Sequence, residues 1–92
     1  MSKVILSGFI LVPASDLSSV LEQLSVHIDL TRNESGCLIF NVEMDADDEC
    51  KFHVYEEFVD KTAFEKHQQR VQSSLWGRVT KNVKRSYAIE GI

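Results

Sequence analysis

Two titratable side chains occupy positions where the sequence pattern predicts apolar residues, and together they could move protons. Glu56 falls on the apolar face of an expected strand, and His67 falls on the apolar side of an expected helix, between Phe64 and Val71. A buried carboxylate is costly unless it is paired, and His67 is the nearest candidate partner. An imidazole, or a carboxyl whose pKa is raised by burial, is suited to general acid–base chemistry near neutral pH. The sequence therefore predicts Glu56 and His67 as a proton-handling pair.

Structural interpretations of both residues remain open at the level of the sequence. His67 could be a core histidine bonded to a backbone carbonyl, and Glu56 could form an ion pair with Arg32 or Lys61 at the end of the sheet. A shift of one residue in strand register would turn Glu56 outward and bring Glu57 to the core face. The placement of these side chains in the folded chain decides between the roles.

Four further side chains are candidates for contact with a substrate. Trp76 could stack on a planar molecule, although a single Trp in a small domain also suits the core. Asn41 and Tyr55 could donate hydrogen bonds to an oxyanion, but strand alternation also allows both to face outward, at a dimer interface. His27 has a similar claim from the first helix. We predict these four residues as substrate-binding candidates.

Metal and disulfide sites are not expected. The acidic loop Asp45–Glu49 lacks the glycine and the terminal bidentate Glu of a calcium-binding loop. Cys37 and Cys50 form neither a CxxC pair nor a zinc-type spacing. A reduced, cytosolic chain is favoured over a secreted disulfide scaffold, and we expect no metal and no cofactor.

The elements that position these residues follow from hydrophobic periodicity and from turn residues. Period-two alternation is typical of strands, whereas apolar spacings of three and four are typical of helices. In chain order the sequence predicts a strand over Lys3–Val12, a helix from Ser15 or Asp16 to about Thr31–Asn33, strands over Cys37–Met44 and Lys51–Phe58, a helix capped by Asp60, a short helix or turn over Leu75–Val79, and a strand over Lys84–Glu90.

The same patterns predict which side chains share a face. The first helix carries one apolar stripe, with His27 at its margin, and the two middle strands each alternate between an apolar and a mixed face. The sets predicted to share a face are Leu17, Val20, Leu21, Leu24 and Ile28 on the helix, Leu38, Phe40, Val42 and Met44 on the second strand, and Phe52, Val54, Glu56 and Phe58 on the third.

The order of elements predicts an α+β fold of the ferredoxin-like βαββαβ type. Right-handed crossovers place the first strand beside the third, which gives an antiparallel four-stranded sheet with both helices on one face. The other face also carries apolar residues, including Ile39 and Tyr55. An exposed apolar sheet face favours a partner, so we expect a homodimer in which two sheets meet face to face.

Length and charge restrict the function further. Ninety-two residues predict a single domain over 1–92. The net charge of −4 argues against a nucleic-acid partner, because phosphate contacts need clustered Lys and Arg. No segment approaches the roughly 20 apolar residues that span a bilayer. We therefore expect a small molecule as the ligand, and neither nucleic acid nor a membrane.

A group of residues spread over nearly the whole chain resembles the antibiotic biosynthesis monooxygenase (ABM) domain family. The signals are Thr31-Arg32, Glu34, Gly36-Cys37-Leu38, Phe40, Asp45–Asp48, Val54-Tyr55-Glu56, Phe58, Asp60, Ala63 and His67. The resemblance implies the dimeric α/β barrel, built from two ferredoxin-like units, and agrees with the fold expected above. Phe58 stands where many members carry Trp.

The resemblance implies a cofactor-independent monooxygenase of a small phenolic or quinol substrate. Such an enzyme needs a dry cavity, a base, and donors that hold the developing oxyanion. Two alternatives remain, an isomerase of a phosphorylated sugar-derived signal molecule and a non-catalytic ligand-binding dimer. The haem-degrading branch is disfavoured, because Ser7 and Gly8 stand where that branch uses Asn and no His follows His67.

Overall fold

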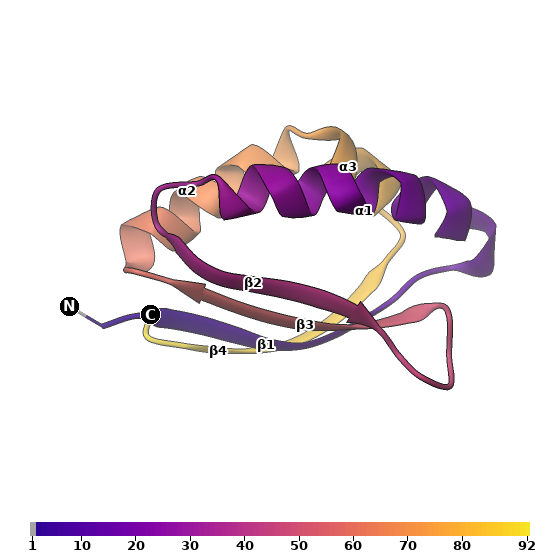
Figure 1. Ribbon diagram of the computed structural model, residues 1–92, viewed down its shortest axis with the longest axis horizontal. Helices are drawn as coiled ribbons and strands as arrows, with labels where there is room; N and C mark the ends of the chain where they lie inside the picture. The colour runs from indigo at the N-terminus through magenta and orange to yellow at the C-terminus, as the bar shows by residue number, and fades with distance from the viewer. Residues whose placement is uncertain (1) are drawn as a thin grey trace.

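The computed structural model describes residues 2–92, and every predicted element is present. Figure 1 shows a four-stranded sheet with the helices packed over one of its faces, and both chain ends at the same end of the sheet. The elements are β1 (Val4–Leu11), a 3₁₀ turn (Ala14–Asp16), α1 (Leu17–Arg32), β2 (Cys37–Met44), β3 (Lys51–Phe58), α2 (Lys61–Gln72), α3 (Leu75–Val79) and β4 (Lys84–Glu90).

The sheet has the strand order β2-β3-β1-β4, and all neighbouring strands are antiparallel. The predicted ferredoxin-like arrangement, with the first strand beside the third, is therefore confirmed. The ends of the four strands differ from the predicted ends by one residue at most. Because β1 is central, its inward side chains Val4, Leu6 and Ile10 are buried under the helices.

A glycine in β1 lets β4 approach closely. Gly8 has a φ of +154°, and a Cβ at this position would lie 1.9 Å from the carbonyl oxygen of Ser86. Gly8 pairs with Val54 on one side and with Tyr87 on the other. Since Gly8 has no side chain on the helix-facing side of the sheet, space remains between Leu6 and Ile10 at the centre of β1.

A β-bulge changes the predicted faces at the start of β2. The pairing with β3 shifts between Cys37 and Ile39, so that Cys37 pairs with Phe58 and packs against the core. Leu38 is left 50% exposed. The prediction that Leu38 shares a face with Phe40 and Val42 was wrong, because a bulge adds one residue and breaks strict alternation. Phe40 and Val42, beyond the bulge, face inward as predicted.

The buried stripe of α1 is rotated from the predicted one. Val20, His27 and Thr31 are buried, whereas Leu21 is 41% exposed. His27 therefore lies at the centre of the buried face and not at its margin. The N-cap position of α1 is Asp16, but its side chain makes no capping bond. Asp60 does cap α2 as predicted, accepting the Ala63 N–H at 2.8 Å.

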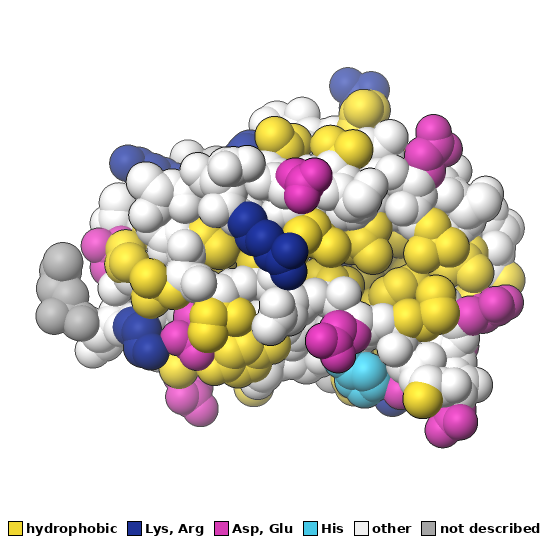
Figure 2. All heavy atoms as spheres, in the orientation of Figure 1, with side chains coloured by type: hydrophobic (Ala, Val, Ile, Leu, Met, Phe, Trp, Pro, Cys, Tyr) yellow, Lys and Arg dark blue, Asp and Glu magenta, His cyan; other side chains and the backbone are white. Residues whose placement is uncertain are grey.

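The helices cover one face of the sheet, and the other face is open. On the side of the molecule in view in Figure 2, hydrophobic side chains form a band between α1 and the sheet. On the opposite side of the sheet, Leu11, Ile39 and Tyr55 are each more than a third exposed. The expected homodimer across this face remains a prediction. Among residues 2–92 no helix is both long enough and apolar enough to cross a membrane.

Candidate active site

A cavity of about 260 Å³ lies between the helix-facing side of the sheet and the helices. An apolar cavity of about 150 Å³ accommodates benzene, so this cavity has room for a substituted ring. The lining is mostly apolar and aromatic, with a few polar side chains, as in many small-molecule sites. It comprises Leu6, Ile10, His27, Phe40, Val42, Val54, Glu56, His67, Gln68, Val71, Trp76, Arg85 and Tyr87.

Glu56 projects from the centre of β3 into this cavity. It pairs in register with Leu6 and Phe40, and it is only 6% exposed. Its Oε1 has no hydrogen-bond partner among residues 2–92. Burial, and next the nearby charge of Glu34, raise its pKa from 4.5 to about 7. Near neutral pH the Glu56 carboxyl can therefore either give or accept a proton.

His67 reaches the same cavity from the middle of α2, and it is 3% exposed. Its Nδ1 lies 2.8 Å from Glu34 Oε1, and its Nε2 lies 3.9 Å from Glu56 Oε1. The second distance is too long for a hydrogen bond. Burial lowers the pKa of His67, and the charge of Glu34 partly opposes that decrease. The imidazole is thus neutral at pH 7, with Nε2 facing Glu56.

Glu34 is a component of the site that the sequence interpretation missed. Its Oε2 accepts a bond from Arg70 Nε at 2.5 Å, and Arg70 Nη2 donates to Thr31 Oγ1 at 2.9 Å. Glu34 lies in the turn before Gly36, where a Cβ would be 2.2 Å from the Ala63 Cβ. The glycine therefore lets the turn pack against α2, one helical turn before His67. The Ser35-Gly36 turn was the sequence feature that could have indicated a close approach of Glu34 to α2.

The alternative ion pair for Glu56 is not formed. Arg32, the expected partner, donates from Nε and Nη2 to the carbonyl oxygen of Phe40, at 3.1 and 2.9 Å. Among residues 2–92 the only cationic candidate within 4.0 Å of Glu56 is His67. Likewise His67 bonds to a carboxylate and not to a backbone carbonyl. The structure therefore shows neither the ion pair of Glu56 with Arg32 or Lys61 nor the bond of His67 to a backbone carbonyl.

One wall of the cavity is a stacked pair of aromatic rings. His27 and Trp76 lie with ring centroids 4.5 Å apart and an interplanar angle of 6°. Both are buried, and Phe40 meets His27 edge-on at 5.3 Å. Burial, followed by the charges of His67, Arg70 and Arg85, lowers the pKa of His27 to about 3. His27 is therefore neutral, and its Nδ1 is a buried polar atom without a bonding partner among the described residues.

Arg85 and Tyr87, from β4, were also missed as site residues. Both line the cavity, because their strand partners Ile10 and Gly8 face the helices. Arg85 Nη2 donates to Thr80 Oγ1 at 2.9 Å, and no carboxylate of residues 2–92 pairs with its guanidinium. Tyr87 is 36% exposed, but desolvation of its hydroxyl next to the cavity raises its pKa to about 12. Tyr87 therefore keeps its proton, and its hydroxyl can donate a hydrogen bond to an anionic oxygen.

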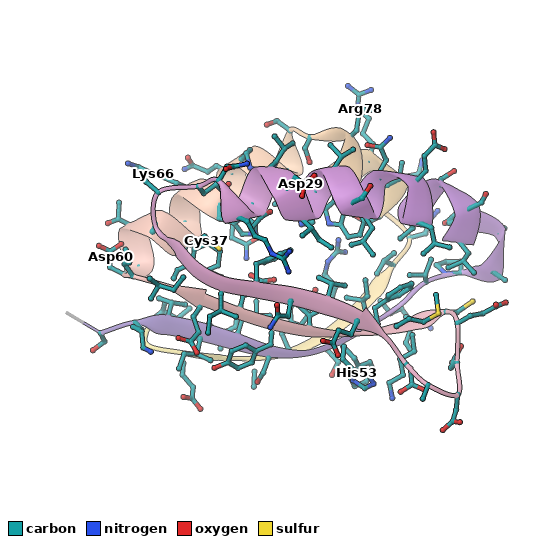
Figure 3. All side chains as sticks on the ribbon, viewed as in Figure 1. Asp29, Cys37, His53, Asp60, Lys66 and Arg78 are labelled. Atoms are coloured by element: carbon teal, nitrogen blue, oxygen red, sulfur yellow. The ribbon has the colours of Figure 1, made fainter. Side chains whose placement is uncertain are left out.

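Asn41 and Tyr55 lie on the other face of the sheet and do not line this cavity. They pair with each other across β2 and β3, one position from the Phe40–Glu56 pair. The Tyr55 hydroxyl donates to Glu57 Oε2 at 2.5 Å. Figure 3 labels His53, which projects from the same face of β3, away from the helices. Strand alternation thus separates these two candidates from Glu56.

The Glu56 and His67 side chains have the chemistry of a general acid and a general base. No group of three or more His, Cys, Asp or Glu side chains that could hold a metal occurs in the described part of the chain. Glu56 and His67 instead provide a carboxyl and an imidazole whose charged forms are both disfavoured by burial. The cavity can therefore take a proton from a bound molecule and return it.

The chain is similar to known proteins in sequence and in fold. Residues 4–76 match the family model "Antibiotic biosynthesis monooxygenase". A structure from Nitrosomonas europaea, described as a "putative antibiotic biosynthesis monooxygenase", aligns with a TM-score of 0.79 at 18% identity, covering 99% of this chain and 98% of that one. A structure of a Pseudomonas aeruginosa protein aligns with a TM-score of 0.75 at 20% identity, covering 98% of this chain and 91% of that one.

A third structure, described as an antibiotic biosynthesis monooxygenase, aligns with a TM-score of 0.70 at 22% identity, covering 97% of this chain and 93% of that one. Comparison with curated proteins gave no match. At these identities the structures show a shared fold, while the family model covers most of the sequence.

Proposed function

The chain belongs to the antibiotic biosynthesis monooxygenase family, and from that premise we propose that it oxidises a small phenol or quinol with O₂ and without a cofactor. The observation that carries the proposal is the buried pair of Glu56 and His67, 3.9 Å apart at the wall of an aromatic cavity. A base next to a dry, ring-sized space is what such chemistry requires of a protein.

The proposed reaction begins with loss of a proton from the substrate. His67 Nε2 accepts the phenolic proton, and the resulting phenolate is electron-rich enough to reduce O₂. One oxygen atom enters the ring and the other leaves as water. For a hydroquinone the balance is hydroquinone plus O₂ to hydroxyquinone plus water, with all electrons supplied by the substrate. Glu56, whose pKa burial raises to about 7, returns a proton to the reduced oxygen.

The developing negative charge has two candidate partners at the β4 side of the cavity. The Arg85 guanidinium is free of ion pairs within the described residues, and Tyr87 retains its hydroxyl proton. Donors placed where charge develops are commonly the largest single contribution to catalysis. The stacked rings of His27 and Trp76 supply a flat surface for the substrate ring.

Oxygen consumption tests this proposal directly. The protein is screened with hydroquinones and phenols in an oxygen electrode, and products are weighed by mass spectrometry under ¹⁸O₂. We expect one labelled oxygen atom in the product. His67→Ala and Glu56→Gln should each reduce turnover about 100-fold or more. The matched control is Glu65→Gln, on the exposed side of α2. Unchanged turnover in both site variants, with the fold intact, would refute the assignment.

The same geometry favours a second candidate, an isomerase of a small phosphorylated sugar derivative. The carboxyl and the imidazole would move a proton through an enediol, and Arg85 would hold the anionic group. Oxygen distinguishes the two, because an isomerase turns over equally well in anaerobic buffer. A non-catalytic binding dimer would instead give a saturable thermal shift with phenols or quinones and no product.

We also propose that the protein is a homodimer in the cytoplasm. Leu11, Ile39 and Tyr55 on the open sheet face supply an apolar surface of the kind that a second copy would cover. Two free cysteines agree with a reducing compartment. Light scattering after size-exclusion chromatography tests the dimer, and a stable monomer at micromolar concentration would contradict it.

A further inference from the structure

His67 separates two spaces in the molecule. Besides the cavity, there is a hollow on the surface. It is lined by the Glu34–Gly36 turn, by Val59 and Asp60 between β3 and α2, and by residues of the first turns of α2, including Lys66. Among residues 2–92, His67 is the only one that lines both spaces. Its two ring nitrogens therefore have different surroundings, Nε2 on the Glu56 side and Nδ1 on the Glu34 side.

Glu34 is held in place from two sides. One carboxylate oxygen lies 2.8 Å from His67 Nδ1, and the other accepts a hydrogen bond from Arg70 Nε. Arg70 is itself anchored to Thr31, which is completely buried in α1. The Glu34 side chain is 22% exposed, against 8% for Glu56. Turn, helix α1 and helix α2 thus all contribute to fixing this one carboxylate.

We infer that Glu34 is a positioning residue, which keeps the His67 proton on Nδ1 and thereby leaves Nε2 free to accept a proton from a molecule in the cavity. A carboxylate paired with a guanidinium can only accept hydrogen bonds. The neutral imidazole next to it therefore carries its proton on Nδ1. This inference rests on the proposed function, because a free Nε2 matters when a substrate proton must be taken.

The alternative tautomer would disable the base. Without Glu34, water in the surface hollow could satisfy Nδ1 as an acceptor, and the ring proton could move to Nε2 and point toward Glu56. Loss of a group that holds a catalytic histidine in the right tautomer is known to reduce turnover by several orders of magnitude. Glu34 also opposes the decrease that burial imposes on the pKa of His67.

The test reads the ring of His67 without any substrate. Nitrogen-15 NMR of the histidine side chains distinguishes the two neutral tautomers and follows the pKa of His67. The charged or titratable groups around the ring are Glu34, Arg70, Glu56 and His27. In the wild-type protein at pH 7 we expect the Nδ1–H tautomer. Glu34→Ala should shift the ring toward Nε2–H and lower the pKa, while Glu34→Asp should partly restore both.

The control and the outcomes separate this inference from the proposed function. Glu65→Gln, elsewhere on α2, should leave the ring unchanged. An Nε2–H tautomer in the wild-type protein overturns the inference, even if Glu34→Ala fails to fold. An unchanged tautomer and pKa in Glu34→Ala overturns it as well. Once a substrate that the protein oxidises is known, Glu34→Ala should oxidise it at least about 100-fold more slowly. If no substrate is found, that result counts against the proposed function and not against the ring assignment.

Discussion

Replacing Glu56 by glutamine should remove a loss of stability that the wild-type protein undergoes as pH rises toward neutrality. Burial raises the pKa of Glu56 from 4.5 to about 7. Between those values the folded chain holds a proton that the unfolded chain has released, so the free energy of unfolding falls as pH rises. At about 1.4 kcal/mol for each pH unit, the loss is about 3 kcal/mol and is complete above pH 7.

A glutamine side chain cannot ionise, so the Glu56→Gln variant should lack this loss. Any constant difference from burying an amide is the same at every pH, and the pH-dependent part alone carries the prediction. We expect the gap in unfolding free energy between variant and wild type to widen by about 3 kcal/mol from about pH 4.5 to about pH 8. Urea titrations followed by circular dichroism across this range, at one fixed protein concentration, measure it.

The neighbouring residue provides a control of opposite sign. Glu57 lies on the other face of β3, and hydrogen bonds from Tyr55 and Lys3 lower its pKa. Its charged form therefore stabilises the fold above the unfolded pKa, and this contribution is lost as pH falls through the lowered value. Glu57→Gln should be less stable than wild type at pH 8, and the difference should close in acid. Parallel curves for wild type and Glu56→Gln from pH 5 to 8 would refute the reasoning.

Three smaller predictions concern the frame of the site. Gly36→Ala should destabilise the fold by about 1–3 kcal/mol, since the new Cβ would lie 2.2 Å from the Ala63 Cβ, and thermal unfolding measures this. Trp76→Ala should cost about 3–5 kcal/mol in urea unfolding, because it removes the ring stacked on His27. Tyr87→Phe should leave stability nearly unchanged and slow turnover of an identified substrate about 10- to 100-fold, by removing one donor to the oxyanion.

The fold could be predicted because its local signals agree with one another. Period-two alternation in β2 and β3, the apolar run in β1 and the Asp60 cap of α2 each specify an element. Their order then admits few arrangements, and right-handed crossovers select one. The positions of Glu56 and His67 on the cavity followed from the same periodicities, since a strand face and a helix stripe are local properties.

What could not be predicted depends on contacts between distant segments. The bulge at Leu38 is set by how β2 pairs with β3 and not by the residues of β2 alone. Glu34 meets His67 across 33 positions in sequence, and Arg70 meets Thr31 across 39. Arg85 reaches the cavity because β4 pairs beside Gly8 on the central strand. A sequence pattern gives the face of each residue, but the partner on that face comes from the tertiary packing.

The charge state of the Glu56 and His67 pair distinguishes a site from a structural ion pair. Burial acts on both groups toward neutrality, because it raises the pKa of the acid and lowers the pKa of the base. In a structural salt bridge the imidazole would be protonated and the two groups would lie at hydrogen-bond distance. Here His67 Nε2 and Glu56 Oε1 are 3.9 Å apart. Each group therefore keeps its capacity, Glu56 to give a proton and His67 to take one. A molecule seated between them and the His27–Trp76 wall would meet both at once, which is the condition for moving a proton to and from the same ring.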